Sequence, residues 1–291
     1  MKKFFALLIA ALFVLGAVGC GGNDAPASSA SPAAPASPAE PAPSGEAPKE
    51  LTVLKVAASP APHAEILNSV KDAMAAEGFD LQVVEYTDYI MPNNAVFNGE
   101  MDANYFQHQP YLTDFNEKNK TDLVAAAAIH FEPLGVYPGK TASLDALADG
   151  ATIVVPNDPT NEARALNLLA AQGIITLKDG VGLAATVKDI TENPKNVKIT
   201  EVEAAQVPMA LPDYDFGVIN GNYAVGAGLS GSILVSEDPN SEAAQTFANI
   251  VAVKPGREND AAVQALVKAL TSEDTRKFIT EKYGVAVVPV F

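Results

Sequence analysis

The sequence predicts an α/β fold, in which strands alternate with helices and mainly parallel sheets are covered on both faces. Apolar runs of strand length are separated along the chain by segments of helical periodicity, and this alternation is typical of such sheets. The roughly 240 residues after residue 50 are enough for one large core or two ordinary ones. Because ligands bind at the carboxyl ends of strands in these folds, polar residues that follow a strand are candidate site residues.

The first part of the chain begins with a predicted buried strand at 51–58, followed by a helix at 62–77. The helix carries apolar residues on one side and ends at Gly78. The next predicted elements are a strand at 81–86, a short helix at 93–98, a short strand at 102–106, a helix that begins at Gln109, and a long extended segment at 123–137.

The second part continues the alternation. We expect strands at 151–155, 197–202, 215–219 and 249–253, and helices at 158–171, 204–211, 261–270 and 273–282. Two extended segments, 129–137 and 249–254, lie where the chain would leave one lobe and later return to it. The sequence therefore predicts a discontinuous first lobe, 51–134 plus 250–291, and a second lobe, 135–249.

The start of the chain predicts a lipoprotein signal peptide at 1–19. Lys2 and Lys3 precede an uncharged apolar run, which is too short for a membrane span. The run ends on small residues before Cys20, the only cysteine, where cleavage and attachment of a diacylglycerol group are expected. An ordinary signal peptide with an incidental cysteine is the alternative. Lipidation predicts an extracytoplasmic protein of the cell envelope, anchored to a membrane by its acyl chains.

Residues 20–50 are predicted to form a lipidated, disordered tether. Ala, Pro, Ser and Gly dominate this segment, and no large apolar side chain is present to be buried. If Cys20 is lipidated, no thiol remains for a disulfide, a nucleophile or a zinc ligand.

The charge of the chain argues against nucleic acid as a partner. Lys and Arg number 19 against 35 Asp and Glu, so the formal net charge is -16. An acidic protein is repelled by phosphate backbones and by anionic lipid surfaces. Attachment to a membrane must then come from the lipid anchor.

The strongest candidate site is a strand, turn and helix start at 153–164. Asp158 suits the N-cap and Pro159 the first helical position. Asn161 and Arg164 lie three residues apart near the amino end of this helix, where an anion is favoured. We expect Arg164 to bind a carboxylate, with Asn161 as an amide donor. The alternative is a surface arginine paired with an acid such as Glu162.

A second candidate is the aromatic segment 104–111. Successive side chains of a strand point to opposite faces, so Tyr105 and Phe106 point opposite ways. We expect Phe106 to face the site and its neighbour to pack inward. Phe106, His108 and Tyr111, with Tyr89 from an earlier turn, are expected to line an apolar slot. Aromatic edges suit a thioether sulfur. The alternative is that these aromatic residues belong to an ordinary core.

A third candidate follows the strand that ends near Ile219. Asn220, Asn222 and Tyr223 surround a glycine there and suit an ammonium or a carboxylate. A simple Asn-Gly turn is the alternative.

Other classes of function have weaker support. Residues 228–232 lack a glycine needed for a nucleophile elbow, and 180–185 imitate a dinucleotide-binding loop without the preceding strand. A metal receptor would need His63, His108 and His130, no two of which have ligand spacing in the sequence. A purely structural lipoprotein explains the tether but not an arginine at a helix start together with an aromatic cluster.

Several segments together resemble the methionine-binding lipoproteins of the NlpA/MetQ family. These segments are 104–112, 155–166, 185–196, 219–224 and the ending 288–291. The resemblance implies a two-lobed periplasmic-binding-protein fold of type II, with methionine in the cleft and no catalysis or cofactor. It also implies delivery of methionine, most readily L-methionine, to an ABC importer with a permease and an ATPase. D-methionine, a methionine derivative and a short peptide remain open as ligands.

The family resemblance also implies roles for single residues. The side-chain pocket falls on Tyr89, Phe106, His108 and Tyr111; the carboxylate contacts fall on Arg164 and Asn161; the contacts near the amino group fall on Asn220 and on Asn222 or Tyr223. This sequence departs from the family pattern at 246–249 and at 230–241, and both segments are expected to lie away from the pocket.

Overall fold

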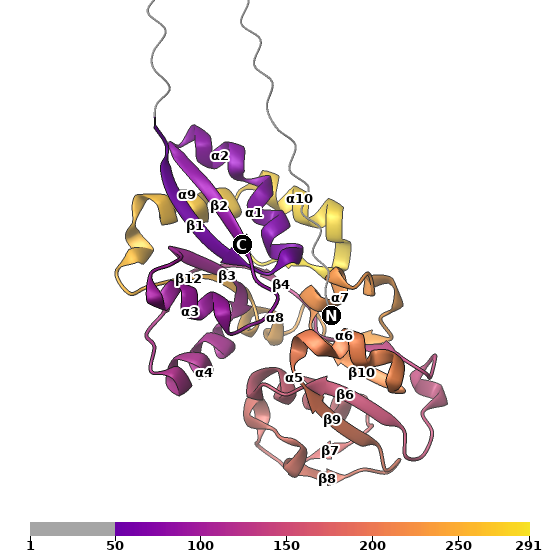
Figure 1. The fold of residues 1–291 in the computed structure, drawn as a ribbon. Helices are drawn as coiled ribbons and strands as arrows, with labels where there is room; N and C mark the ends of the chain where they lie inside the picture. Colours follow the sequence, from indigo (N-terminus) through magenta and orange to yellow (C-terminus); the bar gives the residue numbers. More distant parts are fainter. Residues whose placement is uncertain (1–49) are drawn as a thin grey trace, which may run out of the picture. The chain divides into compact units, whose positions relative to one another are not determined.

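The computed structural model describes residues 50–291 (Figure 1). The predicted signal peptide, Cys20 and the tether up to residue 49 lie outside the described residues. The described chain is an α/β structure built on two mixed sheets, of six and five strands, with a small two-stranded sheet beside them.

The six-stranded sheet has the order β13-β4-β12-β3-β1-β2. Its strands are β1 (Thr52–Ala58), β2 (Phe79–Glu85), β3 (Ala103–His108), β4 (Val124–Phe131), β12 (Asn249–Val253) and β13 (Val288–Pro289). β1 pairs in parallel with β2 and β3, whereas β12 runs antiparallel to β3 and β4, and β13 runs antiparallel to β4.

Helices cover both faces of this sheet. They are α1 (Glu65–Ser69), α2 (Lys71–Ala76), α9 (Ala261–Leu270) and α10 (Glu273–Tyr283) on one face, and α3 (Met91–Asn98) and α4 (Gln109–Asn119) on the other. The side chains of β12 alternate between these two faces. Val251 and Val253 pack against the helices α1, α2, α9 and α10, whereas Ile250 and Ala252 pack on the face covered by α3 and α4. The strand is buried on both faces, as its unbroken apolar sequence predicts.

The five-stranded sheet has the order β11-β5-β10-β6-β9. Its strands are β5 (Gly135–Pro138), β6 (Thr152–Pro156), β9 (Lys198–Val202), β10 (Phe216–Ile219) and β11 (Val235–Ser236). α5 (Pro159–Ala171) covers one face, and α6 (Val207–Ala210) and α7 (Gly221–Gly226) pack on the other. The small sheet pairs β7 (Thr176–Leu177) with β8 (Ile190–Glu192).

Short helical turns and one further helix complete the described chain. They are η1 (Pro60–Ala64), η2 (Leu144–Ala146), η3 (Gly182–Ala184), η4 (Val187–Asp189), η5 (Ala204–Gln206), η6 (Leu211–Asp213), η7 (Ser230–Ser232), α8 (Glu242–Thr246), η8 (Arg257–Asn259) and η9 (Gly284–Ala286).

The chain passes between the two large sheets twice. It leaves the first sheet between β4 and β5, at residues 132–134, and it returns between β11 and β12, at residues 237–248. The two crossing segments lie close to each other, because the backbone N–H of Leu134 donates to Glu237 at 2.9 Å.

The predicted α/β fold is confirmed, with differences in detail. The sheets are mixed rather than mainly parallel, because each has two parallel pairings and the rest are antiparallel. The helix expected at 62–77 is divided at Val70, whose ψ of 4° interrupts the helical backbone. The extended segment expected at 123–137 forms two strands on either side of Pro133.

The second sheet depends on a core that is separate from the core of the first. Phe216, in the middle strand β10, is fully buried. We expect Phe216→Ala to lower the free energy of unfolding by about 3–5 kcal/mol, because it removes a large buried side chain and leaves a cavity. Chemical denaturation measures this loss. Phe97→Ala is the matched control, since Phe97 is 40% exposed and its loss is expected to cost much less; equal losses would contradict the prediction.

Candidate functional site

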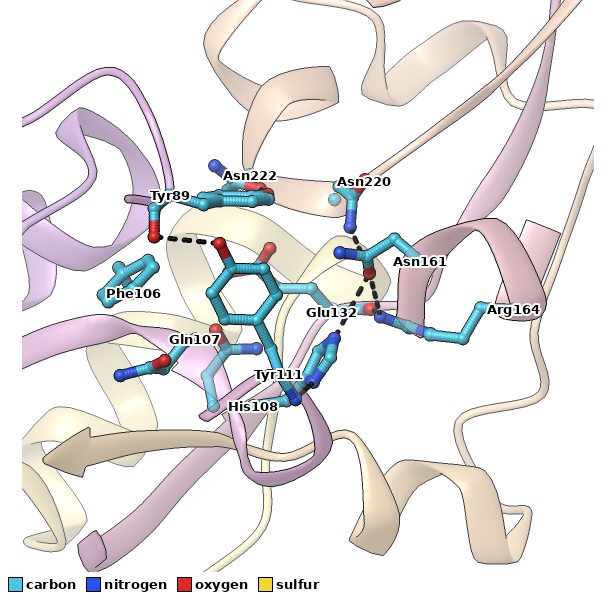
Figure 2. Close-up of a pocket in the computed structure, with 12 residues that line it drawn as sticks. Tyr89, Phe106, Gln107, His108, Tyr111, Glu132, Asn161, Arg164, Asn220 and Asn222 are labelled. Atoms are coloured by element: carbon cyan, nitrogen blue, oxygen red, sulfur yellow. Dashed lines mark hydrogen bonds between the residues drawn. The ribbon is translucent and has the colours of Figure 1, made fainter. Parts of the chain in front are cut away.

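A cavity of about 20 Å³ lies between residues of the two sheets (Figure 2), which is room for little more than one water molecule in this arrangement. The lining residues follow or end strands of both sheets, as expected for an α/β fold. They are Tyr89, Phe106, Gln107, His108, Tyr111, Glu132, Asn161, Arg164, Asn220, Gly221, Asn222 and Asn249.

One wall of the cavity is aromatic. The ring of Tyr89 lies 5.8 Å from that of Phe106 and 5.7 Å from that of Tyr111, centroid to centroid. Tyr111 and Phe106 face each other edge to face at 6.1 Å. Tyr105 points the other way from β3 into the core of the first sheet, as strand alternation predicts. The four predicted slot residues, including His108, therefore all line one cavity.

His108 connects the aromatic wall to the polar one. Its Nδ1 accepts a hydrogen bond from the backbone N–H of Tyr111 at 3.1 Å, so the ring caps helix α4. Its Nε2 lies 3.2 Å from Oδ1 of Asn161. Burial, followed by the nearby charge of Arg164, lowers the pKa of His108 to about 3. The ring is therefore neutral at physiological pH and donates from Nε2 to Asn161.

Asn161 forms hydrogen bonds with the cap of its own helix, Asp158, and with His108 and Asn220. Asp158, the predicted N-cap of α5, accepts from the backbone N–H of Asn161 at 3.1 Å and from its Nδ2 at 2.9 Å. Oδ1 of Asn161 accepts from Asn220 at 2.9 Å as well as from His108. The amide nitrogen that sequence reasoning assigned to a ligand carboxylate is thus bound to Asp158 in this arrangement.

Arg164 is the one cation among the residues that line the cavity. Its side chain is 4% exposed and forms a bidentate ion pair with Glu237, at 3.0 Å from Nε and 2.5 Å from Nη2. Nη2 also donates to the backbone carbonyl of Glu132 at 3.3 Å, and the ring of Phe247 lies 4.2 Å from the guanidinium carbon. Nη1 lies 3.5 Å from Oδ1 of Asn161, and both residues line the cavity.

Two sequence expectations about Arg164 are therefore wrong. The alternative partner Glu162 instead accepts from the backbone of Val187. Segments 230–241 and 246–249, expected to lie away from the pocket, supply the acid and the aromatic ring that hold Arg164, and Asn249 lines the cavity itself. Arg164 and Glu237 are 73 residues apart in the sequence, so no local pattern could have predicted their contact.

The segment after β10 forms helix α7 and not a simple Asn-Gly turn. Oδ1 of Asn220 is buried and has no hydrogen-bond partner among the described residues. Asn222 accepts from the hydroxyl of Tyr89 at 2.5 Å. Tyr223 packs against Tyr89 at 4.9 Å and donates to the carbonyl of Thr87; it does not line the cavity. Asn220 therefore presents a free acceptor, whereas Tyr223 supports the wall from outside.

Four residues that line the cavity were not among the predicted site residues: Gln107, Glu132, Gly221 and Asn249. Gln107 joins a buried amide network with Asn93, 2.8 Å away, and with Asn104. Asn249 is the first residue of the apolar strand β12, and Glu132 directly follows the apolar strand β4. A polar residue at the end of an apolar strand was the signal that could have found them.

The three histidines that were considered for a metal receptor are divided in the structure. His63 and His130 come together with Glu132, with ligand atoms all within 4.8 Å of one another. His108 lies instead against Asn161. Separately, none of the helices in residues 50–291 has the length and apolar character needed to cross a membrane.

The sequence profile described as NlpA lipoprotein matches residues 54–291. The chain belongs to the NlpA lipoprotein family. This family assignment covers every residue of the cavity and of both large sheets except the first two residues of β1.

Relatives of this NlpA lipoprotein include proteins of known structure. The methionine-binding lipoprotein MetQ of Bacillus subtilis (strain 168) is 37% identical and aligns over 100% of this chain and 99% of its own. A lipoprotein structure from Ruminococcus gnavus is 53% identical, with a TM-score of 0.81 over 82% of this chain and 100% of its own. A nutrient-binding protein from Burkholderia cenocepacia, solved with bound methionine, is 40% identical, with a TM-score of 0.78 over 82% and 100%.

The NlpA lipoprotein has all three of its histidines buried. Burial lowers the pKa of His63 to about 4 and those of His108 and His130 to about 3, from an ordinary value of 6.5. Below pH 6.5 the unfolded chain therefore binds protons that the folded chain does not, and stability falls as the pH falls. Three such groups contribute at most about 4 kcal/mol per pH unit.

We expect the free energy of unfolding to decrease between pH 7 and pH 4.5, measured by chemical denaturation at fixed ionic strength. Burial raises the pKa of Glu132 and of Asp158, and this opposes part of the loss, because the folded state takes up those protons first. Between pH 7 and pH 8 stability is expected to be constant within about 1 kcal/mol, which serves as the control. Equal stability at pH 7 and pH 4.5 would contradict this prediction.

Proposed function

We propose that this lipoprotein binds methionine in the cavity between its two lobes and delivers it to an ABC importer. The observation that carries the proposal is the cavity itself, which combines an aromatic wall with a guanidinium N–H and a free carbonyl acceptor. The bound methionine in the Burkholderia relative and the MetQ relative from Bacillus support the choice of ligand.

The aromatic wall suits the side chain of methionine. Tyr89, Phe106 and Tyr111 present ring edges and faces about 6 Å from one another. A thioether sulfur is polarisable and is attracted to such ring edges by about 0.3–1.5 kcal/mol. None of the slot residues Tyr89, Phe106, His108 and Tyr111 carries a charge at neutral pH, so the slot does not favour a charged side chain.

The polar end suits an α-amino acid head group. Nη1 of Arg164 is the proposed partner of the ligand carboxylate. Oδ1 of Asn220 is a buried acceptor without a partner in the described chain, and an ammonium group would satisfy it. Asn161, which sequence reasoning placed on the carboxylate, is proposed to hold His108 and Asn220 in place. Asn222 has the same supporting role for Tyr89.

Binding requires no covalent step, so the proposed role is capture and not catalysis. The proposed lobes are 51–134 with 250–291, and 135–249; the membership of the two large sheets supports this division. Hydrogen bonds from Tyr89 to Asn222 and between His108 and Asn161 join them across the cavity. Closure of the lobes would bury the ligand, and the importer permease and its ATPase would receive it.

The proposed anchor is a diacylglycerol group on Cys20, joined to the lobes by the tether at 20–50. It would hold the protein at the extracytoplasmic face of a membrane, within reach of the permease. The family assignment as a lipoprotein supports this, and mass spectrometry of the protein from membranes would test it.

The first test is isothermal titration calorimetry with the protein unfolded and refolded to remove trapped ligand. We expect binding of L-methionine with a Kd in the micromolar range or below, about 8 kcal/mol or more, and no comparable binding of other natural amino acids. D-methionine, methionine sulfoxide and a methionine dipeptide are titrated in parallel to define the ligand. Lack of binding for every methionine compound would contradict the proposal.

The second test removes the proposed carboxylate partner. Arg164→Ala is expected to weaken methionine binding by about 2–5 kcal/mol, because a buried ligand charge loses its partner. Arg257→Ala is the control, since Arg257 also forms ion pairs, with Asp102 and Asp260, but does not line the cavity. Unchanged affinity for Arg164→Ala in a folded protein would show that the carboxylate binds elsewhere.

A further inference from the structure

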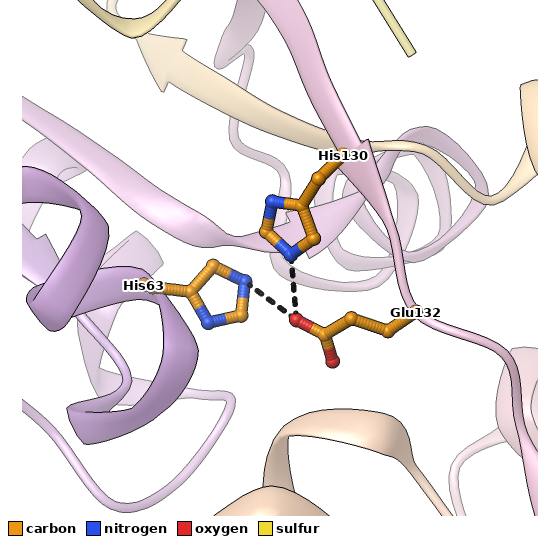
Figure 3. A group of neighbouring side chains, drawn as sticks. All are labelled: His63, His130 and Glu132. Carbon is orange, nitrogen blue, oxygen red and sulfur yellow. Dashed lines mark hydrogen bonds and ion pairs between the residues drawn. The ribbon is translucent and has the colours of Figure 1, made fainter. Parts of the chain in front are cut away.

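A buried cluster of two histidines and an acid adjoins the cavity through the acid, Glu132 (Figure 3). His63 comes from η1, His130 from β4, and Glu132 from the crossing segment that follows β4. The two histidines have no exposed surface and Glu132 is 6% exposed. Oε1 of Glu132 lies 2.7 Å from Nε2 of His130 and 3.3 Å from Nε2 of His63.

The hydrogen bonds fix which nitrogen of each ring carries the proton. Nδ1 of His130 meets the hydroxyl of Tyr105 and accepts from it, so Nε2 carries the proton and donates to Glu132. Nδ1 of His63 has no partner within the described part of the chain. Its Nε2 has two acceptors, Glu132 and, at 2.9 Å, Oδ1 of Asn249. Nε2 of His130 therefore donates to the carboxylate, whereas Nε2 of His63 donates to Asn249 and lies 3.3 Å from Oε1 of Glu132.

Glu132 belongs both to this cluster and to the cavity. It is the one acid among the residues that line the cavity. Gly221 stands directly beside it: a β-carbon at position 221 would lie 2.6 Å from Cβ and 3.1 Å from Oε2 of Glu132. The absence of a side chain at Gly221 thus leaves Oε2 on the side of the carboxylate that faces Asn220 and Asn222, away from the histidines.

We infer that Glu132 is the ionic partner of the ligand ammonium group, and that His63 and His130 are positioning residues that hold its carboxylate for this purpose. The inference rests on the proposed function and extends it to the specificity for an amino group. The cavity then carries one cation and one anion, Arg164 and Glu132, for the two charges of a zwitterion.

The physical reason lies in desolvation. An ammonium group transferred to a closed cavity loses its water, and neutral amide acceptors such as Asn220 replace only part of that solvation. A buried carboxylate supplies the missing charge, but it needs donors of its own to remain ionised. His130 supplies such a donor and His63 lies beside the carboxylate, and neither ring adds a positive charge that would repel the ligand, because burial lowers the pKa of both rings far below neutrality.

The same three side chains also have the chemistry of a metal site, since all three ligand atoms lie close together. The hydrogen bonds favour the positioning role. Nε2 of His130 points its proton at the acid, Nε2 of His63 points its proton at Asn249, and Nδ1 of His130 is bound by Tyr105. Metal binding is therefore included below as a competing result.

The inference predicts a pH dependence that only an amino ligand shows. Burial raises the pKa of Glu132, whereas Arg164, the histidines and a backbone N–H of Asn222 oppose this rise. The other titratable groups that face Glu132 are the phenols of Tyr89, Tyr105, Tyr137 and Tyr283, which stay neutral. Protonation of Glu132 on acidification removes the negative charge, so methionine affinity is expected to fall with pH.

The experiment compares methionine with its hydroxy analogue, in which a hydroxyl replaces the amino group. By calorimetry at pH 7.5, Glu132→Gln is expected to weaken methionine binding by about 30-fold or more and to change binding of the hydroxy analogue by about 3-fold or less. Glu77→Gln is the control, because Glu77 is half exposed and pairs with Lys268. Equal effects of Glu132→Gln on both ligands, or no effect on methionine, would overturn the inference.

Two histidine variants test positioning and remain informative if Glu132→Gln does not fold. His130→Leu removes the donor, so the pH at which methionine affinity falls is expected to rise by about one unit; His130→Gln keeps an N–H and is expected to restore it in part. An unchanged pH profile in His130→Leu would overturn the positioning role. Zinc binding that depends on His63 and His130, and that alters methionine affinity, would favour a metal site instead.

If the unmodified protein binds neither methionine nor the hydroxy analogue, the proposed function fails, and not this inference alone. If it binds both with equal affinity and the same pH dependence, methionine binding stands and the role of Glu132 is wrong.

Discussion

The buried charge of Arg164 is the constraint on which the candidate site depends. A guanidinium that is 4% exposed requires partners, and the two crossing segments between the sheets supply them. Glu237 and Phe247 come from the returning segment, and the carbonyl of Glu132 comes from the outgoing one. Nε and Nη2 of Arg164 are held by these contacts, and Nη1 is left to Asn161, which lines the cavity.

The contacts of Glu237 connect the candidate ligand site to the segments that set the relative position of the lobes. Glu237 binds Arg164 and also accepts from the backbone of Leu134, so one carboxylate links the cation to both crossing segments. A ligand carboxylate on Nη1 would share the guanidinium with Glu237. Movement of one lobe against the other changes these same segments, so occupancy of the cavity and closure would influence each other.

The sequence predicted most of the long elements, because their apolar periodicity is local. It also predicted Asp158 as the cap of α5 and the aromatic slot, since these residues stand together in the chain. The sequence did not predict β11 and α7, because elements of two and six residues carry little periodicity. The pairing of Arg164 with Glu237 and the approach of His63 to Glu132 are created by tertiary folding, and no spacing within a segment encodes them.

The most direct test of this account is a crystal structure of the protein with L-methionine. The account predicts the sulfur among the rings of Tyr89, Phe106 and Tyr111, the carboxylate on Nη1 of Arg164, and the ammonium within hydrogen-bond distance of Asn220. A methionine bound with its head group at the aromatic wall, or bound outside this cavity, would contradict it.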